Sequence, residues 1–285
     1  MFASLAVGLL AAAQPSALNG AVLARACEGK DGWSDPAPPA RIHGNTYYVG
    51  TCGISAILIT GPRGHILIDG ATDQASRFIA ANVARLGFRM RDVKLILSSH
   101  EHIDHVGGLA ALQRLSGASV VARNQAVPAL TTGETQADDP QHGSLPRFPR
   151  VTIGRIVPHG GGVQLGPLRL TAYATPGHTS GSTTWTWHSC EGRRCLNIVY
   201  ADSISAVSAD GYRFSAHPAY VATFRESIAR IADLPCDLLV TPHPSASNLF
   251  ERFANGRLAD PAACRDYAAR ATARLDARLA QEAGR

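Results

Sequence analysis

Four side chains that can bind a metal ion fall within six residues of this chain. They follow residues 93–97, an apolar run that predicts a buried strand, and they are His100, His102, Asp104 and His105. Imidazole and carboxylate groups are ligands that zinc accepts, and one ion rarely takes all four from so short a loop. His100 and His102, which are two residues apart, can point to the same side of the loop, while Asp104 and His105 point in a different direction. The spacing therefore favours two adjacent metal ions at the end of a strand.

Two further histidines stand in a similar position. His178 follows the strand-like run 168–174 in a Thr-Pro-Gly-His sequence, and His243 follows the run 237–241 in a Thr-Pro-His sequence. Either one alone is more often a packed or surface histidine, but the loop at 100–105 needs partners, because catalytic zinc takes three protein ligands. We expect both to be metal ligands. Glu101, inside the loop, is expected to face the solvent or to support the ligands from behind.

The segments around these motifs alternate between strand-like and helix-like patterns. Each half of the chain shows strands, a helix and then a strand that ends in histidine, which predicts two similar halves that face each other. The predicted strands are 46–49, 55–59, 65–69, 93–98, 119–122, 151–157, 168–174, 183–188, 196–200 and 237–241. The predicted helices are 74–86, 109–115, 220–234 and 261–283, and the polar residues 127–149 are predicted to form a surface loop.

The first 26 residues differ from the rest of the chain. They hold one charged side chain, Arg25, and an apolar run at 5–13, which together predict a secretory signal peptide although no basic residue follows Met1. Small residues at 11–13 and 24–26 are the candidate cleavage sites. The remaining residues, 27–285, are expected to form one domain in the periplasm. No apolar stretch reaches 18 residues, so we expect no membrane span after processing.

Composition supports a large folded domain and excludes some classes of protein. Apolar residues make up 45% and charged residues 17%, which permits a sizeable core and excludes global disorder. The net charge of +5 comes without a basic run, so nothing indicates a nucleic-acid partner.

The six cysteines are expected to form disulfide bonds in an oxidising compartment. None lies in a Cys-x-x-Cys pair or beside a clustered histidine, which argues against a thiolate zinc site. Six cysteines allow 15 pairings, of which the bridge across a four-residue hairpin is the easiest. A second bridge could hold the last helix against a strand, and a third could fix the N-terminal arm. These pairs are Cys190–Cys195, Cys236–Cys264 and Cys27–Cys52.

The His-x-His-x-Asp-His loop, the Pro-Gly-His and the Thr-Pro-His resemble the metallo-β-lactamase superfamily. Residues 44–51, 67–70, 182–185, 200–205 and 241–248 further resemble the β-lactamases of subclass B3. The resemblance implies an α/β fold, a four-layer αββα sandwich of two β-sheets flanked by helices. It also implies two Zn²⁺ ions, one bound by His100, His102 and His178 and the other by Asp104, His105 and His243. The three disulfide pairs occur in some members of that subclass.

The same resemblance implies hydrolysis of the β-lactam amide bond, and hence antibiotic inactivation, by a zinc-bound hydroxide that Asp104 orients. Ser203 and Ser205 would bind the carboxylate of the substrate, and Tyr212 would reach its carbonyl oxygen. The partner is then a small β-lactam molecule, and we expect the protein to be a monomer.

A lactone or thioester hydrolase of the glyoxalase II type is the main alternative on this fold. Such thioesterases bridge their metals with a carboxylate on the strand after the third histidine. Counting from Tyr200, the metal-facing position here is Ser203, and Asp202 points to the other face unless a bulge intervenes. The pattern therefore favours the β-lactamase. A zinc-binding exported protein without catalytic activity is the remaining alternative.

Overall fold

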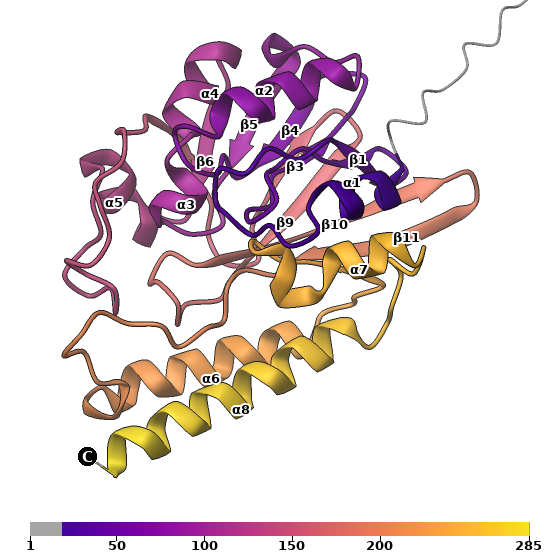
Figure 1. Ribbon diagram of the computed structural model, residues 1–285. Helices are drawn as coiled ribbons and strands as arrows, with labels where there is room; N and C mark the ends of the chain where they lie inside the picture. The colour runs from indigo at the N-terminus through magenta and orange to yellow at the C-terminus, as the bar shows by residue number, and fades with distance from the viewer. Residues whose placement is uncertain (1–18, 285) are drawn as a thin grey trace, which may run out of the picture.

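Two β-sheets lie face to face at the centre of the structure, and helices cover their outer faces (Figure 1). The computed structural model describes residues 19–284. The four-layer αββα sandwich that the sequence predicts is confirmed. No helix between residues 19 and 284 combines the length and the apolar character needed to cross a membrane.

The first sheet contains seven strands in sequence order. The strands β1 to β4 pair antiparallel, whereas β4 to β7 run parallel. Parallel neighbours need crossover connections, and the helices α2 (Ser76–Arg85) and α4 (Leu109–Ser116) provide them on the outer face. The strands are β1 (Ala40–His43), β2 (Thr46–Tyr48), β3 (Ile57–Ile59), β4 (His65–Ile68), β5 (Val93–Leu97), β6 (Ser119–Ala122) and β7 (Ile153–Ile156).

The second sheet contains five strands in the order β12-β11-β10-β9-β8. Three hairpin pairings are antiparallel, and β12 joins the edge parallel to β11. The long helices α6 (Pro218–Asp233) and α8 (Ala263–Ala283) lie side by side across its outer face (Figure 1). The strands are β8 (Gly162–Leu165), β9 (Leu168–Ala174), β10 (Thr183–Glu191), β11 (Arg194–Tyr200) and β12 (Leu238–Val240).

Side-chain alternation along the strands builds the layers. In β11, Ile198 and Tyr200 pack into the core between the sheets, whereas Val199 packs against the helices outside. In β4, Ile68 faces the second sheet and Leu67 faces the helices of the first. Successive strand residues point to opposite faces, so these apolar runs are buried on both sides.

The structure adds elements that the sequence patterns did not predict. The strands β1 and β8 lie at sheet edges, and the short helices α3 (Ile103–Val106) and α7 (Leu249–Ala254) are also new. The predicted surface loop 127–149 was wrong at its start, where α5 (Val127–Thr132) forms. Pro128 fits the first turn of this helix, and Gly133 ends it at φ 78°, where a Cβ would lie 2.3 Å from the Phe148 carbonyl oxygen.

All three predicted disulfide pairs are present in the structure. They join Cys27 to Cys52, Cys190 to Cys195 and Cys236 to Cys264, with Cα–Cα distances of 5.2, 4.0 and 6.2 Å. The last bridge fixes the start of α8 to the segment that leads into β12.

Most of the predicted signal peptide, residues 1–18, lies outside the described residues. Its last part is folded: residues 20–26 form α1 (Gly20–Ala26), capped by the Asn19 side chain. Leu23 in this helix is fully buried in the same core cluster as Phe253 of α7. The candidate cleavage site at 24–26 therefore falls inside a packed helix.

Candidate metal centre

The loop after β5 changes backbone conformation halfway along, and this divides its side chains into two directions. His102 is still extended at φ −88° and ψ 149°, and the helical turn α3 begins directly after it. The start of the loop is held by Asp69, whose carboxylate accepts hydrogen bonds from the backbone N–H and the hydroxyl of Ser99 at 2.8 and 2.6 Å. The split that the residue spacing suggested is thus produced by the switch from strand to helix.

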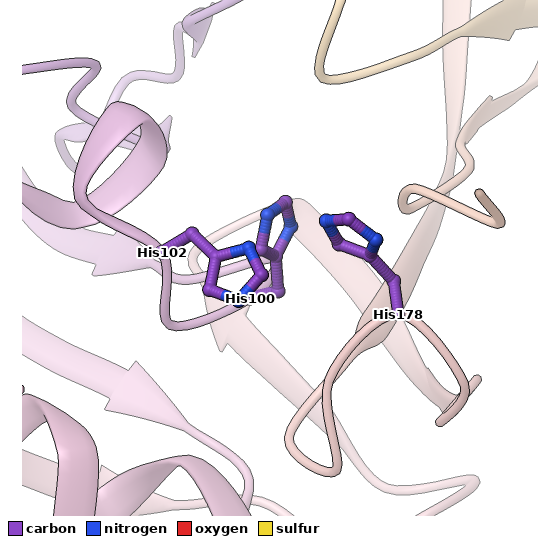
Figure 2. A group of neighbouring side chains, drawn as sticks. All are labelled: His100, His102 and His178. Carbon is purple, nitrogen blue, oxygen red and sulfur yellow. The ribbon is translucent and has the colours of Figure 1, made fainter. Parts of the chain in front are cut away.

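His100, His102 and His178, the first ligand set, come together at the ends of β5 and β9. One ring nitrogen of each lies within 4.8 Å of the others, and all three side chains are buried. Figure 2 shows the three rings turned toward one another across the gap between their loops. The histidine from the second half of the chain therefore completes a set begun by the first half.

A hydrogen bond anchors the outer nitrogen of each ring in this set. The inner nitrogens are thereby left to face one another, and the inner Nε2 of His100 has no hydrogen-bond partner among the described residues. Metal-binding histidines commonly donate their other N–H to a carboxylate or a carbonyl group, as here. The anchors are Asp202 Oδ1 at 2.7 Å from His100 Nδ1, Asp139 Oδ2 at 2.8 Å from His102 Nε2, and the Ser205 carbonyl oxygen at 3.0 Å from His178 Nδ1.

Asp104, His105 and His243, the second ligand set, form a tight triangle beside the first. Asp104 Oδ2 lies 3.1 Å from His105 Nε2 and 3.3 Å from His243 Nε2, and the two nitrogens are 3.4 Å apart. Three ligands on a tetrahedral zinc ion, at bonds of about 2.0–2.1 Å, are roughly 3.3 Å from one another. The triangle fits that requirement, so the residues present suit a bound zinc ion.

Burial prepares two histidines of the first set, His100 and His178, for metal binding. It lowers the pKa of His100 and of His178 well below the ordinary value, and the neighbouring imidazoles lower both further. Their rings are consequently neutral at pH 7, which is the form that binds a metal ion.

Opposite charges face each other in the second set. Burial alone would raise the pKa of Asp104, but His105 outweighs it and holds that pKa well below its usual range. Burial likewise opposes the charge on His105, whose pKa is nevertheless raised by the Asp104 carboxylate. The carboxylate is therefore ionised and available to a cation.

The structure shows where two acidic side chains near the site lie, and for Glu101 it separates the two expected roles. Glu101 does not face the solvent: it is 3% exposed and accepts hydrogen bonds from Thr179 Oγ1 at 2.8 Å and Gly181 N–H at 2.9 Å. Burial raises its pKa to about 7. It thus supports the site from behind, which was the other expected role. Asp202 contacts the outer nitrogen of His100, so its bonded oxygen faces away from the inner Nε2.

The predicted substrate-binding residues fall into two groups. Ser203 and Ser205 line a cavity of about 390 Å³ together with His243. Tyr212 lines a separate hollow and stacks on His217 with ring centroids 4.7 Å apart. Its contact with the substrate carbonyl stays a prediction.

The sequence analysis named Asp202 and Ser205 without predicting that they anchor histidine rings, and it missed Asp139. Asp139 lies in the stretch predicted as a surface loop, and its partner His102 is 37 residues away. No local pattern marks such a residue, because an isolated aspartate in a polar loop is ordinary. Only the paired Asp-Asp-Pro sequence of turn residues distinguishes this stretch.

The profile of the metallo-beta-lactamase superfamily matches residues 49–191, which include the loop at 100–105 and His178. The chain belongs to the metallo-β-lactamase superfamily. Similar solved structures narrow the likeness to subclass B3. The metallo-β-lactamase MIM-1 from Novosphingobium pentaromativorans is 50% identical with a TM-score of 0.90, and the alignment covers 92% of this chain and 98% of that one. MEM-A1, a subclass B3 metallo-β-lactamase from a soil metagenome library, is 46% identical with a TM-score of 0.86, over 89% and 99%.

Among curated relatives, a hydroxyacylglutathione hydrolase of Anaeromyxobacter dehalogenans is 30% identical over 178 residues. The match covers 61% of this chain and 55% of that relative, so the chain spans little more than half the relative's length. This relative is therefore less similar to the chain than the subclass B3 structure is.

Proposed function

We propose that this protein is a zinc-dependent hydrolase that opens the amide bond of β-lactams. The two ligand sets would hold two Zn²⁺ ions, and their adjacency is the observation that carries the proposal: the rings of His100 and His105, one from each set, have centroids 4.2 Å apart. Near-complete coverage at about half identity by structures named as metallo-β-lactamases supports the substrate class. The weaker and partial likeness to a thioesterase does not.

Three residues of the chain would have distinct roles in this reaction. Zinc, when bound, lowers the pKa of water enough to supply a nucleophile at neutral pH. Asp104 would orient that nucleophile, and its position between His105 and His243 leaves its carboxylate fixed. Ser203 would receive the carboxylate of the substrate in the 390 Å³ cavity. The Ser205 hydroxyl lies 3.1 Å from His178 Nδ1, so it would also keep that ring in place.

A thioester or lactone hydrolase remains the second candidate because a curated relative is a hydroxyacylglutathione hydrolase. The position of Asp202 favours one of the two candidates. In the glyoxalase II pattern a carboxylate bridges the metals, whereas here the bonded oxygen of Asp202 contacts the outer nitrogen of His100. This position favours the β-lactamase.

The cellular setting belongs to the same proposal. A periplasmic protein with a cleaved signal peptide agrees with three disulfide bonds, which form in oxidising compartments. Because α1 is packed into the core, cleavage at 11–13 fits better than cleavage at 24–26. A monomer acting on small-molecule β-lactams would then confer antibiotic resistance.

A chelator experiment tests the proposal. We expect the purified mature protein to contain two zinc ions and to hydrolyse nitrocefin, a penicillin and a carbapenem, with activity lost in a chelator and restored by zinc. His102→Ala should abolish turnover, whereas His188→Ala, an exposed histidine on β10, should not. If the protein hydrolysed no β-lactam but did hydrolyse an acyl-homoserine lactone or a thioester, the proposed substrate class would be wrong and the second candidate would be supported.

A further inference from the structure

The loop at 133–149 reaches into the metal centre through one buried carboxylate. Asp139 is 4% exposed, although it lies in a polar loop whose neighbouring residue, Asp138, is exposed. An ionised carboxylate is rarely buried without partners. Its contacts therefore indicate a role beyond the surface.

Both oxygens of Asp139 are occupied. Oδ2 lies 2.8 Å from Nε2 of His102, and Oδ1 accepts the backbone N–H of Gln141 at 2.7 Å. The side-chain amide nitrogen of Gln141 lies 3.5 Å from Nδ1 of the same ring. The loop thus contacts both nitrogens of His102.

The same loop is tied to the segment that follows β11. The carbonyl oxygen of Pro140 accepts the backbone N–H of Ala209 at 2.8 Å. Ala209 follows Ser203 and Ser205 in the chain, so the loop contacts both the ring of His102 and the segment that carries the residues proposed to bind substrate. A shift of the loop at Asp139 would therefore displace both.

A neutral imidazole carries one N–H and one lone pair. The Oδ2 atom of Asp139 beside Nε2 favours the tautomer with its proton on Nε2, so the lone pair is on Nδ1, the nitrogen that the Gln141 amide also approaches and that faces the first ligand set. The hydrogen bond to Asp139 also fixes the orientation of the His102 ring. Both effects act on the geometry of the ligand rather than on the substrate.

We propose that Asp139 is a positioning residue for the first ligand set, and that it makes retention of that metal dependent on the conformation of the loop 133–149. The inference rests on the proposed zinc site. It adds a specific partner for His102 and a route from a surface loop to the metal.

The pair Asp139→Asn and Asp138→Asn tests the assignment with a neighbouring aspartate as control. Asparagine offers one acceptor oxygen, so the variant at 139 must lose either the His102 bond or the Gln141 bond. We expect the zinc dissociation constant of the first site to rise about 10- to 100-fold, the usual effect of losing such a partner. The variant at 138 should keep the wild-type constant.

The measurement is competition with a chromophoric chelator, which resolves two zinc constants, and His102→Ala identifies which of them belongs to the first site. Far-UV circular dichroism of the metal-free proteins shows whether each variant is folded. An independent readout on the wild type is the ¹⁵N NMR tautomer of His102 in the zinc-loaded protein. Protonation at Nε2 is expected, and protonation at Nδ1 would overturn the inference without any variant.

The outcomes separate the two proposals. If the wild type binds two zinc ions and Asp139→Asn binds them with unchanged constants, the role of Asp139 is refuted while the zinc hydrolase stands. If the wild type binds no zinc, the proposed function fails and this inference fails with it. A loss confined to the first constant in Asp139→Asn supports both.

Discussion

Replacing Glu101 tests how the two metal-binding loops are held together. In the sequence, Glu101 stands between two histidines of the first set. Its carboxylate accepts hydrogen bonds from Thr179 Oγ1 and Gly181 N–H, which follow His178 in the chain. The side chain therefore connects the loop after β5 to the loop after β9. We expect Glu101→Ala to destabilise the metal-free protein and to weaken zinc binding, whereas Glu101→Gln should be mild.

The magnitude follows from the partners that each variant leaves behind. In Glu101→Ala, Thr179 can turn its hydroxyl to Ser182 Oγ at 3.1 Å, but the buried N–H of Gly181 loses its acceptor. One stranded donor and one lost bond to a carboxylate together give a loss of about 2–4 kcal/mol. Glutamine keeps an oxygen for Gly181, and its amide can donate to Thr179, so the loss should stay below about 1 kcal/mol.

Urea unfolding of the metal-free, disulfide-intact proteins measures these differences, because bound zinc would add its own stabilisation. Glu134→Ala is the control, since that residue forms an exposed ion pair with Arg147 and should change stability by less than about 1 kcal/mol. The reasoning is refuted if Glu101→Ala unfolds at the wild-type urea concentration, or if the glutamine variant loses as much as the alanine variant.

Three further predictions concern the segments around the site. Removing Cys236–Cys264, with a sequence separation of 28, should cost about 3.6 kcal/mol, and removing Cys190–Cys195, with a separation of 5, about 2.1 kcal/mol; urea unfolding giving the reverse order would contradict the loop-entropy account. The backbone N–H groups of Phe214 and Ser215 and the Arg278 guanidinium outweigh burial and lower the pKa of Glu282 from 4.5 to about 2. Its stabilisation should be present above pH 4.5 and lost as the pH falls to about 2, so wild type and Glu282→Gln should converge in melting temperature at the acid end. Arg274 lines the cavity of Ser203 and Ser205, and Arg274→Ala should raise KM for anionic β-lactams about 2- to 5-fold with kcat unchanged; an equal KM would remove Arg274 from substrate recognition.

Much of the fold could be predicted because burial leaves a local pattern. The strands β6 and β9 have the bounds that the apolar runs indicated, since each is a short hydrophobic stretch between turns. The strands β1 and β8 could not be found in this way. Each is four residues long and lies at a sheet edge, where pairing with one neighbour, rather than composition, defines it.

The site shows the same division. The ligand candidates follow strands and stand close together in the sequence, so their types and spacing identified them. The residues that hold these ligands in place could not be identified in this way. Asp139, Asp202 and the Thr179 hydroxyl become hydrogen-bond partners only when distant segments of the chain meet. The solvent-facing role considered for Glu101 failed for that reason: nothing local shows that the loop after β9 covers it.

The proposed ligands are divided between the two halves of the chain, and this has a consequence for the order of assembly. The first half supplies four of them, and the second half supplies His178 and His243. His100, Asp104 and His105 of the first half also lie within 4.8 Å of one another, but neither of the two proposed sets is complete within one half. A nascent or partly translocated chain would thus complete the two proposed sets only after the sheets have docked, so metal binding by these sets would require finished folding and would then hold the two halves together.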